Sequence, residues 1–547
     1  MVSKNQFYEA AIEGMTLEGS GVARVDGFAV FIPLAAPGDF VRFKVVKVLK
    51  RYAFGLLDRV LTPSPDRLPE AEQGCPVYRR CGGCAFRHIR YEAERRLKEE
   101  AVRDAFRRLG GFELDPLPIL AAPETDRYRN KAQYPLGIGP DGRVAAGFYA
   151  RNSHRIIPAA DCPLQPVIFS EIIRFVTDFL TQNRLPVYDE QSGTGVYRHI
   201  YLREAPGTGE VMLCLVAARP DPPKAKELAA RVRERFPAVV SIWLNVNPAR
   251  TNVILGERYD LLSGKEQITD LFLGKRLSIS PASFYQVNQP QAERLYQLAF
   301  DFAGFDGSEH LLDLYCGIGS IGLSASDRIS RLTGVEIVPQ AVENACFNAA
   351  QNGVPHAEFF CADASAAAKR LAAEGARPDV VIVDPPRKGC GREVIEAIFE
   401  MGPGRVVMIS CNPATAARDC ALLAGGGYCL EKYQPVDLFP RTGHVETVVL
   451  LSKGEIDSKK VRVEFSLEDM DMSGFQQGAT YEQIKAYVLE KHGLKVSSLY
   501  ISQVKRKCGL DVGQNYNLSK KEDAKVPQCP PEKEAAIMEA LKHFHMV

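Results

Sequence analysis

The chain has 547 residues, enough for roughly three or four domains, and its 46% hydrophobic and 25% charged residues are typical of a soluble globular protein. It has no run of about 20 apolar residues and no signal-peptide core near Met1, and its 14 irregularly spaced Cys fit a reducing compartment, so we expect a cytoplasmic protein without a membrane partner. The formal net charge of +1 gives no sign of nucleic-acid binding, which leaves local clusters of charge to indicate it.

The first part of the chain has the pattern of a small β-barrel. Apolar and polar positions alternate between Gly and Pro residues, which predicts short strands at residues 19–24, 28–33 and 39–49. Between Arg42 and Arg59 there are six Lys or Arg against one Asp. A basic strip of this kind is most often solvated surface, and a polyanion such as RNA is the functional alternative. We place this domain at residues 1–61.

A cluster of Cys follows the predicted barrel. Three occur within ten positions and a fourth lies farther along the chain; they are Cys75, Cys81, Cys84 and Cys162. Four Cys can hold a zinc ion or a [4Fe–4S] cluster. Structural zinc sites usually present two C-x2-C pairs and one such pair occurs here, which weighs against zinc. Free thiols are the third alternative.

The next predicted domain, at residues 75–275, mixes helices and strands. Residues 91–109 have apolar side chains on one helical face and are followed by two Gly, so they predict an amphipathic helix, which we expect to pack on the candidate catalytic domain at residues 276–453. Further patterns predict strands at residues 211–216 and 239–246 and helices at residues 166–180 and 224–236. The sequence therefore predicts an α/β or α+β domain here.

Strands and helices alternate between Pro281 and Ser452, which predicts a doubly wound parallel sheet in a domain at residues 276–453. Such sheets bind ligands at the carboxyl ends of their strands. Polar groups follow three predicted strands: a loop with Gly317 and Gly319, then Glu336, then Asp363.

These three strand ends have the chemistry of a nucleoside site. Glycines let the backbone approach a ligand, and an acidic residue about 20 positions later can bind both ribose hydroxyls. Asp363 is placed to accept a hydrogen bond from an adenine amine. Ribose and adenine sites without a pyrophosphate cradle fit S-adenosylmethionine better than NAD. The alternative is a strand-turn-helix unit that binds no ligand.

Two further strand ends carry reactive groups. The loop Asp384-Pro385-Pro386-Arg387 is similar to the Asp-Pro-Pro loops of adenosylmethionine enzymes that act on nucleobases. Cys411 follows the apolar run 406–410, and Glu446 precedes another apolar run. A thiolate could add to C6 of a pyrimidine and make C5 nucleophilic, and a buried carboxylate could then remove the C5 proton. The alternatives are a buried Cys that acts as a small hydrophobe and a surface Glu at the start of a strand.

Four motifs together resemble the RNA 5-methyluridine methyltransferases: Asp313-Leu314-Tyr315-Cys316-Gly317-Ile318-Gly319, Asp384-Pro385-Pro386-Arg387-Lys388-Gly389, Ser410-Cys411-Asn412-Pro413 and His444-Val445-Glu446. The similarity is to the type that modifies uracil in 23S ribosomal RNA, and it covers about residues 1–453.

The resemblance implies a role for each candidate residue. Cys411 is the nucleophile and Glu446 the proton acceptor, and Asp384 lies near both the cofactor and the target base. The residues expected to bind S-adenosylmethionine are Gln286, Tyr315, Gly317, Glu336, Asp363 and Asp384. Relatives can have Asn where this chain has Ser320 and Asp363, which puts those two contacts in question.

The resemblance also assigns the other parts of the chain. It favours a [4Fe–4S] cluster on the four Cys over zinc, in a structural or RNA-binding role. It also implies that the predicted barrel is an OB-like TRAM domain and that the basic strip of this domain binds RNA phosphates. Residues 454–547 lie outside the resemblance; two predicted helices there, 480–492 and 498–508, could add an RNA or ribosomal contact.

The sequence thus predicts a monomeric enzyme that methylates C5 of uridine in 23S ribosomal RNA. A tRNA enzyme acting on the T-loop is one alternative, and the predicted barrel and Cys cluster weigh against it. A non-catalytic iron–sulfur RNA-binding factor is the other, and the retained Cys411 and Glu446 weigh against that.

Overall fold

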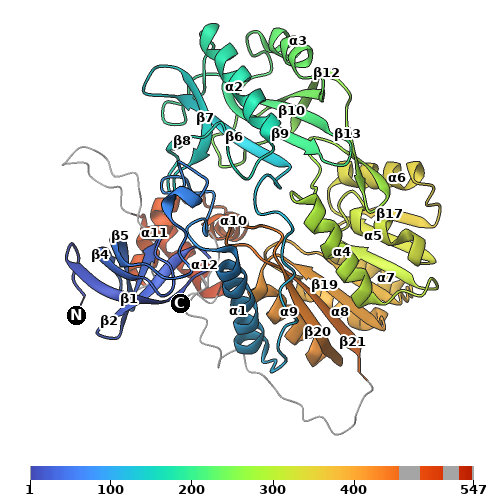
Figure 1. The fold of residues 1–547 in the computed structure, drawn as a ribbon. Coiled ribbons are helices and arrows are strands. Elements are labelled where there is room, and N and C mark those ends of the chain that lie inside the picture. Colours follow the sequence, from blue (N-terminus) through green and yellow to red (C-terminus); the bar gives the residue numbers. More distant parts are fainter. Residues whose placement is uncertain (1, 455–480, 509–528, 545–547) are drawn as a thin grey trace. The chain divides into compact units, whose positions relative to one another are not determined.

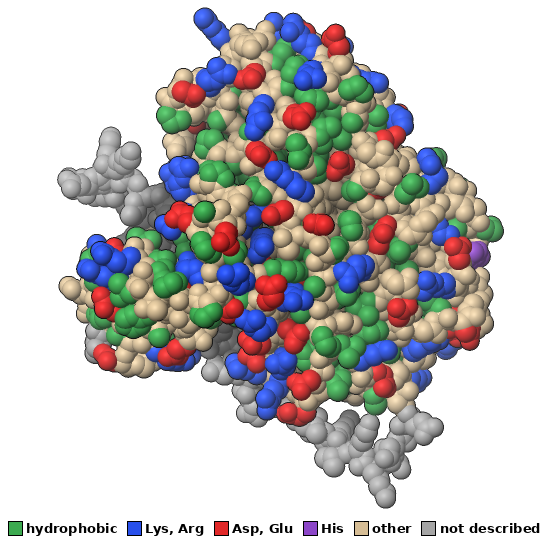
Figure 2. Space-filling model, in the orientation of Figure 1, with side chains coloured by type: hydrophobic (Ala, Val, Ile, Leu, Met, Phe, Trp, Pro, Cys, Tyr) green, Lys and Arg blue, Asp and Glu red, His purple; other side chains and the backbone are tan. Residues whose placement is uncertain are grey.

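A computed structural model describes residues 2–454, 481–508 and 529–544 (Figure 1). The chain divides into two compact units, the first ending at Ile456 and the second beginning at Asp457. On the face drawn in Figure 2, Lys and Arg side chains are interspersed with Asp and Glu. In the part of the chain that the structure describes, no helix is long and apolar enough to cross a membrane.

The N-terminal part of the first unit is the predicted barrel. Five strands close it in the order β1-β2-β3-β5-β4, in which β3 and β5 are parallel and the other pairs antiparallel. The strands are β1 (Phe7–Met15), β2 (Ser20–Val25), β3 (Phe28–Pro33), β4 (Phe40–Val48) and β5 (Tyr52–Thr62). Alternate residues such as Val30, Ile32 and Phe43 are fully buried inside it, as the period-two pattern predicted.

After the short helix η1 (Glu70–Glu72), a Cys-rich segment (residues 75–86) and the long helix α1 (Tyr91–Gly110) connect the barrel to the rest of the unit. Helix α1 ends where Gly111 adopts φ 69°. It packs on the catalytic domain: Phe106 is fully buried and its ring stacks on Tyr433 with centroids 4.2 Å apart. Burying this aromatic pair fixes α1 against the catalytic sheet.

The central domain is a seven-stranded sheet in the order β12-β11-β10-β9-β6-β7-β8. Its pairs are antiparallel except β10 with β11. The elements are β6 (Lys131–Ile138), β7 (Val144–Tyr149), β8 (Ile156–Pro158), α2 (Val167–Gln182), β9 (Tyr197–Ala205), β10 (Glu210–Ala217), α3 (Ala225–Arg235), β11 (Val239–Val246) and β12 (Arg258–Gly264), followed by the hairpin β13 (Ile268–Phe272) and β14 (Lys275–Ile279). Helices α2 and α3 bury their apolar faces against one side of the sheet.

The catalytic sheet has the order β17-β16-β15-β18-β19-β21-β20. Its strands are β15 (His310–Leu314), β16 (Arg331–Glu336), β17 (Ala357–Cys361), β18 (Val380–Val383), β19 (Arg405–Ser410), β20 (Tyr428–Val436) and β21 (Glu446–Lys453). The first five are parallel, but β21 is antiparallel to both β19 and β20, so the prediction of a wholly parallel sheet is wrong at this edge. The connection between β20 and β21 is too short for a crossover, which forces the chain to return antiparallel.

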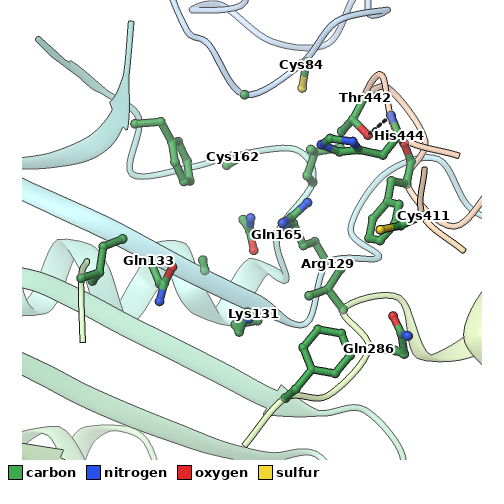
Figure 3. Close-up of a pocket in the computed structure, with 18 of the residues that line it drawn as sticks. Cys84, Arg129, Lys131, Gln133, Cys162, Gln165, Gln286, Cys411, Thr442 and His444 are labelled. Atoms are coloured by element: carbon green, nitrogen blue, oxygen red, sulfur yellow. Dashed lines mark hydrogen bonds between the residues drawn. The ribbon is translucent and has the colours of Figure 1, made fainter. Parts of the chain in front are cut away.

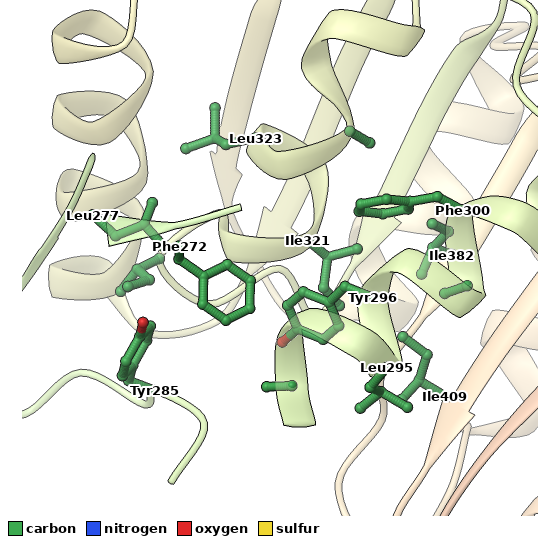
Figure 4. Close-up of a cluster of buried hydrophobic side chains, with 14 of the residues drawn as sticks. Phe272, Leu277, Tyr285, Leu295, Tyr296, Phe300, Ile321, Leu323, Ile382 and Ile409 are labelled. Atoms are coloured by element: carbon green, nitrogen blue, oxygen red, sulfur yellow. The ribbon is translucent and has the colours of Figure 1, made fainter. Parts of the chain in front are cut away.

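Helices cover both faces of this sheet. They are α4 (Gln289–Ala303), α5 (Ser320–Ala325) with η2 (Ser326–Arg328), α6 (Pro339–Gln351), α7 (Ala364–Ala373), α8 (Arg392–Met401) and α9 (Pro413–Gly425). Helices α4, α5 and α6 pack on one face, where Tyr296, Phe300 and Ile382 share a core (Figure 4), and α7, α8, α9 and α1 pack on the other.

The second unit contains α10 (Tyr481–His492), α11 (Ser498–Lys507) and α12 (Pro531–His543). Their buried residues include Ile484, Val504 and Ile537, which form a separate small core. The two predicted helices are present, and α12 was not predicted, although it begins at Pro531 with Glu532 and Glu534 in its first turn, a usual helix start.

Candidate active site

One cavity of about 890 Å³ lies where three parts of the first unit meet. The Cys-rich segment, strand β6 and the carboxyl ends of the catalytic strands all contribute side chains to it. In the view of Figure 3, Cys411 and Gln286 lie toward one end, and Cys162 and Gln133 toward the other. The predicted reactive residues and the Cys cluster therefore share a single cavity.

Cys411 occupies the predicted place, directly after β19 and before α9. Asn412 caps α9 by accepting a hydrogen bond from the Ala414 backbone N–H, which fixes the turn that presents the thiol. The pKa of Cys411 is raised to about 11, mainly by burial and also by the negative charges of Glu446 and Asp384, while Arg387 acts in the opposite direction. The resting group is therefore a protonated thiol.

Glu446 is the first residue of β21 and is 4% exposed. Burial raises the pKa of its carboxyl well above the usual value, and Asp384 adds to the effect. Asp384 follows β18, and burial raises its pKa to about 7. A carboxylate with a raised pKa is a better proton acceptor than a solvated one, so the cavity contains two candidate bases beside one thiol.

Arg387 and His444 complete this end of the cavity, and neither was predicted as a site residue. The Arg387 guanidinium lowers the pKa of both Cys411 and Glu446, and its Nη2 lies 3.2 Å from the His444 Nε2. Burial and Arg387 lower the pKa of His444 to about 4, so the imidazole is neutral. Both residues stand inside motifs that the sequence analysis identified. The sequence did not indicate that they contact each other, because they are 57 positions apart.

The predicted cofactor residues gather around the end of β15. Tyr315 has φ 69°, a strained conformation for a non-glycine residue, directly after the strand. Gly317 has φ 57°, and a Cβ there would meet no atom within 4 Å, so the backbone faces open space. Glu336 holds this loop by accepting a hydrogen bond from the Gly317 N–H at 3.1 Å. Gln286 is 7% exposed and lines the same cavity.

The structure places Asp363 differently from these residues. It is exposed, does not line the cavity, and caps α7 by accepting hydrogen bonds from the Ser365 and Ala366 N–H groups. Its charge still contributes to the raised pKa of the Tyr315 phenol, so it lies near that side chain. A contact between Asp363 and a cofactor stays a prediction.

The four predicted cluster ligands come from two chain segments and all face the cavity: Cys75, Cys81, Cys84 and Cys162. None of them is in a disulfide. Burial raises the pKa of Cys84 to about 12 and that of Cys162 to about 11; the charges of Cys162 and Cys81 also raise the pKa of Cys84, and those of Cys75 and Cys81 also raise the pKa of Cys162. Within the described residues, no three His, Cys, Asp or Glu side chains form a ready-made site for a single metal ion.

A model of the tRNA (uracil-5-)-methyltransferase family matches residues 276–454, and a model of the TRAM domain matches residues 2–57. Uncharacterized RNA methyltransferases from Halalkalibacterium halodurans and Bacillus cereus are 43% and 42% identical to this chain over 451 and 455 residues. These matches cover 82% and 83% of this chain and 98% of each relative.

Among solved structures, the tRNA (uracil-54, C5)-methyltransferase of Pyrococcus abyssi, in complex with S-adenosyl-L-homocysteine, is similar with 28% identity and a TM-score of 0.65. The match covers 81% of this chain and 99% of that chain.

Proposed function

The chain belongs to the S-adenosylmethionine-dependent RNA (uracil-5-)-methyltransferases with a TRAM domain, and we propose that it methylates C5 of uridine in 23S ribosomal RNA through a covalent adduct on Cys411. The observation that carries the mechanism is the pairing of a thiol and a buried carboxyl in one cavity. Cys411 and Glu446 come from adjacent strands, β19 and β21, and the charge of Glu446 raises the pKa of the thiol.

The proposed reaction begins with covalent attack on the base and ends with release of the enzyme. The Cys411 thiolate forms a bond to C6 of uracil, and the electrons of the C5–C6 double bond pass to C5 and O4. S-adenosylmethionine, when bound, would supply an electrophilic methyl group: C5 forms a bond to this methyl group while the bond from the methyl group to the sulfonium sulfur breaks and leaves a neutral thioether. Glu446 then removes the C5 proton, the double bond reforms, and the thiolate leaves C6. The base must be flipped out of any helix to reach the thiol.

The chain's own residues prepare these steps. Arg387 favours the thiolate form of Cys411 and stabilises negative charge that develops on the base. The residues proposed to hold the methyl donor are Gln286, Tyr315, Gly317, Glu336, Asp363 and Asp384. The open space beside Gly317 fits such a ligand, and Glu336 would exchange one of its two backbone hydrogen bonds for ribose hydroxyls.

The Cys-rich segment would hold a [4Fe–4S] cluster, with Cys75, Cys81, Cys84 and Cys162 as ligands. Four free thiols that face one cavity fit this group. Ligand sulfurs of a cluster stand farther apart than those around one ion, because iron and sulfide atoms lie between them, which fits the lack of a mononuclear site in the described residues. Its role would be to cross-link the segment 75–84 to residue 162.

A tRNA substrate is the second candidate. The barrel and the Cys cluster favoured ribosomal RNA, but the enzyme from Pyrococcus abyssi is named for tRNA, and the match covers 81% of this chain, more than the catalytic domain alone provides. The presence of the barrel therefore does not decide between ribosomal RNA and tRNA as the substrate.

Mass mapping of 5-methyluridine in both RNAs tests the proposal. A deletion strain should lose 5-methyluridine from 23S ribosomal RNA, and the wild-type chain should restore it whereas Cys411→Ala should not. Loss from tRNA alone would replace the ribosomal substrate by the T-loop. Unchanged 5-methyluridine in both RNAs would contradict the methylation itself.

A further inference from the structure

Residues 437–445 form the loop between β20 and β21 and lead directly to Glu446 in the cavity. Several parts of the first unit form hydrogen bonds with this loop. Its position sets where the carboxylate stands, because Glu446 is the first residue after the loop. Hydrogen bonds from outside β20 and β21 reach several of its backbone carbonyls, among them Asn288 Nδ2 to Leu438 O (3.0 Å), Lys98 Nζ to Phe439 O (3.2 Å), Tyr128 Oη to Pro440 O (2.8 Å) and Ala85 N to Arg441 O (2.8 Å).

Arg441 is the strained point of this loop. Its φ of 68° lies in the left-handed region, which a residue with a side chain adopts at a cost. Both of its peptide groups are held in that conformation. Its N–H donates to Glu94 Oε1 at 2.7 Å, and its carbonyl accepts from the N–H groups of Ala85 and Phe86 at 2.8 and 3.1 Å. The two N–H donors belong to the Cys-rich segment and directly follow Cys84.

Glu94 is fully buried and is itself held by one turn of α1. Lys98, also fully buried, donates from Nζ to Glu94 Oε1 at 2.8 Å and to Asp437 Oδ1 at 2.7 Å. Since Lys98 also donates to the Phe439 carbonyl, this turn of α1 binds the loop at residues 437, 439 and 441. Helix α1 cannot shift easily, because Phe106 stacks on Tyr433 of β20.

We infer that Glu94 and Lys98 are positioning residues for the proposed base: they act through the backbone of Arg441 to fix where Glu446 stands. The inference rests on the proposed function, in which Glu446 removes the C5 proton. It adds that the Cys-rich segment takes part in the same positioning, through the N–H groups of Ala85 and Phe86.

The two chemical steps should respond differently when this support is removed. Cys411 is held by β19 and by the cap of α9, and neither belongs to the loop. A displaced loop should therefore slow proton removal while the thiol can still add to C6. The methylated covalent adduct would then accumulate on ordinary uridine RNA, as it should in Glu446→Gln.

A matched pair of substitutions at Arg441 tests the effect of its backbone conformation separately from the effect of its side chain. Glycine adopts φ near 68° without strain and keeps both peptide hydrogen bonds, whereas a β-branched residue is strongly disfavoured there. Both variants remove the guanidinium. Arg441→Gly should keep turnover within about threefold of wild type, and Arg441→Val should lose about tenfold or more in kcat and accumulate adduct on denaturing gels.

A second pair of substitutions, at Glu94, leaves the sequence of the loop unchanged. Glu94→Gln keeps an oxygen that accepts from the Arg441 N–H and should retain most of the turnover, while Glu94→Leu removes the acceptor and should accumulate adduct. Helix content by circular dichroism shows whether each variant is folded, and this pair decides the case if Arg441→Val does not fold.

Trapping on RNA that contains 5-fluorouridine separates the possible failures, because it requires Cys411 and does not require the base. Variants that trap normally but release product as fast as wild type would overturn the positioning inference and leave the proposed function intact. Trapping and turnover that fall together in Arg441→Val and Glu94→Leu would also overturn it, by showing a general structural role. A wild-type chain that never forms the trapped complex would overturn the proposed function.

Discussion

Replacing Lys98 by Met tests how much the buried charges between α1 and the catalytic domain contribute to stability. The ammonium group lies 2.8 Å from Glu94 Oε1 and 2.7 Å from Asp437 Oδ1, and all three side chains are 0% exposed. Methionine has nearly the same length and fills the space with apolar atoms, but it removes the ammonium group from two buried carboxyl groups; Glu94 keeps Arg441 Nη1 at 3.7 Å from its Oε2. Removing one partner of a buried ion pair costs about 3–5 kcal/mol.

Urea-induced unfolding, followed by far-ultraviolet circular dichroism, measures this loss. The matched control is Arg96→Ala on the same helix, whose ion pair with Asp66 is 57% and 35% exposed. An exposed pair contributes about 0–1 kcal/mol, so the control should lower the free energy of unfolding by less than about 1 kcal/mol. If Lys98→Met and Arg96→Ala cost the same, the buried cluster does not stabilise the junction.

The stability loss of Lys98→Met should also change with pH in a definite direction. Burial raises the pKa of Glu94, and Lys98 lowers it, so removing Lys98 raises it further. A carboxyl with a raised pKa binds its proton more tightly in the folded state than in the unfolded state. Its protonation therefore stabilises the folded variant at acidic pH, and this contribution disappears as the pH rises through the folded pKa. The deficit of Lys98→Met should shrink toward about pH 4.5 and grow toward about pH 8.

Four further predictions address the chemistry and the RNA. RNA containing 5-fluorouridine should trap the wild-type chain and not Cys411→Ala, because fluorine does not leave as a proton does; persistent trapping would reassign the nucleophile. Alkylation of Cys411 in the free protein, read by peptide mass spectrometry, should accelerate about tenfold per pH unit between about pH 7 and pH 10, because burial raises its pKa to about 11; a plateau near pH 8 would contradict this. Protein purified without oxygen should be brown, with absorption near about 400 nm and iron and sulfide in about equal amounts, whereas colourless protein with one zinc would refute the cluster. Changing Lys44, Lys47 and Lys50 to Gln should weaken RNA binding and lower its salt slope by about 0.7 for each phosphate that is no longer neutralised, with unchanged S-adenosylmethionine affinity; an unchanged slope would make the barrel structural.

Local pattern predicted those site residues that stand next to a strand. Cys411 directly follows β19 and Glu446 begins β21, as the apolar runs beside them indicated. Gly317 lies in the loop after β15, where a turn and an open backbone were expected. In each case the residue and the strand that positions it are adjacent in the sequence, so a short window contains the information.

Long-range arrangement was not predictable in this way. Lys98 and Asp437 are 339 positions apart, and nothing near either residue indicates that they form a buried pair. For Asp363 the position in the chain, after β17, was predicted, but the direction of the side chain was not: it caps α7 outside the cavity. The antiparallel place of β21 between β19 and β20 depends on how the last hairpin joins the sheet, which periodicity does not report.

The pKa values in the cavity indicate when the proposed nucleophile becomes reactive. With a pKa of about 11, about one Cys411 in 10⁴ is a thiolate at pH 7, so the free protein has little of the attacking form. Burial is the main cause, and the negative charges of Glu446 and Asp384 act in the same direction, while Arg387 opposes them. A cationic methyl donor bound beside these groups would lower the pKa of the thiol by the same Coulomb interaction, and the neutral product that remains after methyl transfer would not. The chain would therefore favour the attacking thiolate while a methyl group is available, and the pKa of the thiol would rise again once the methyl group has been transferred.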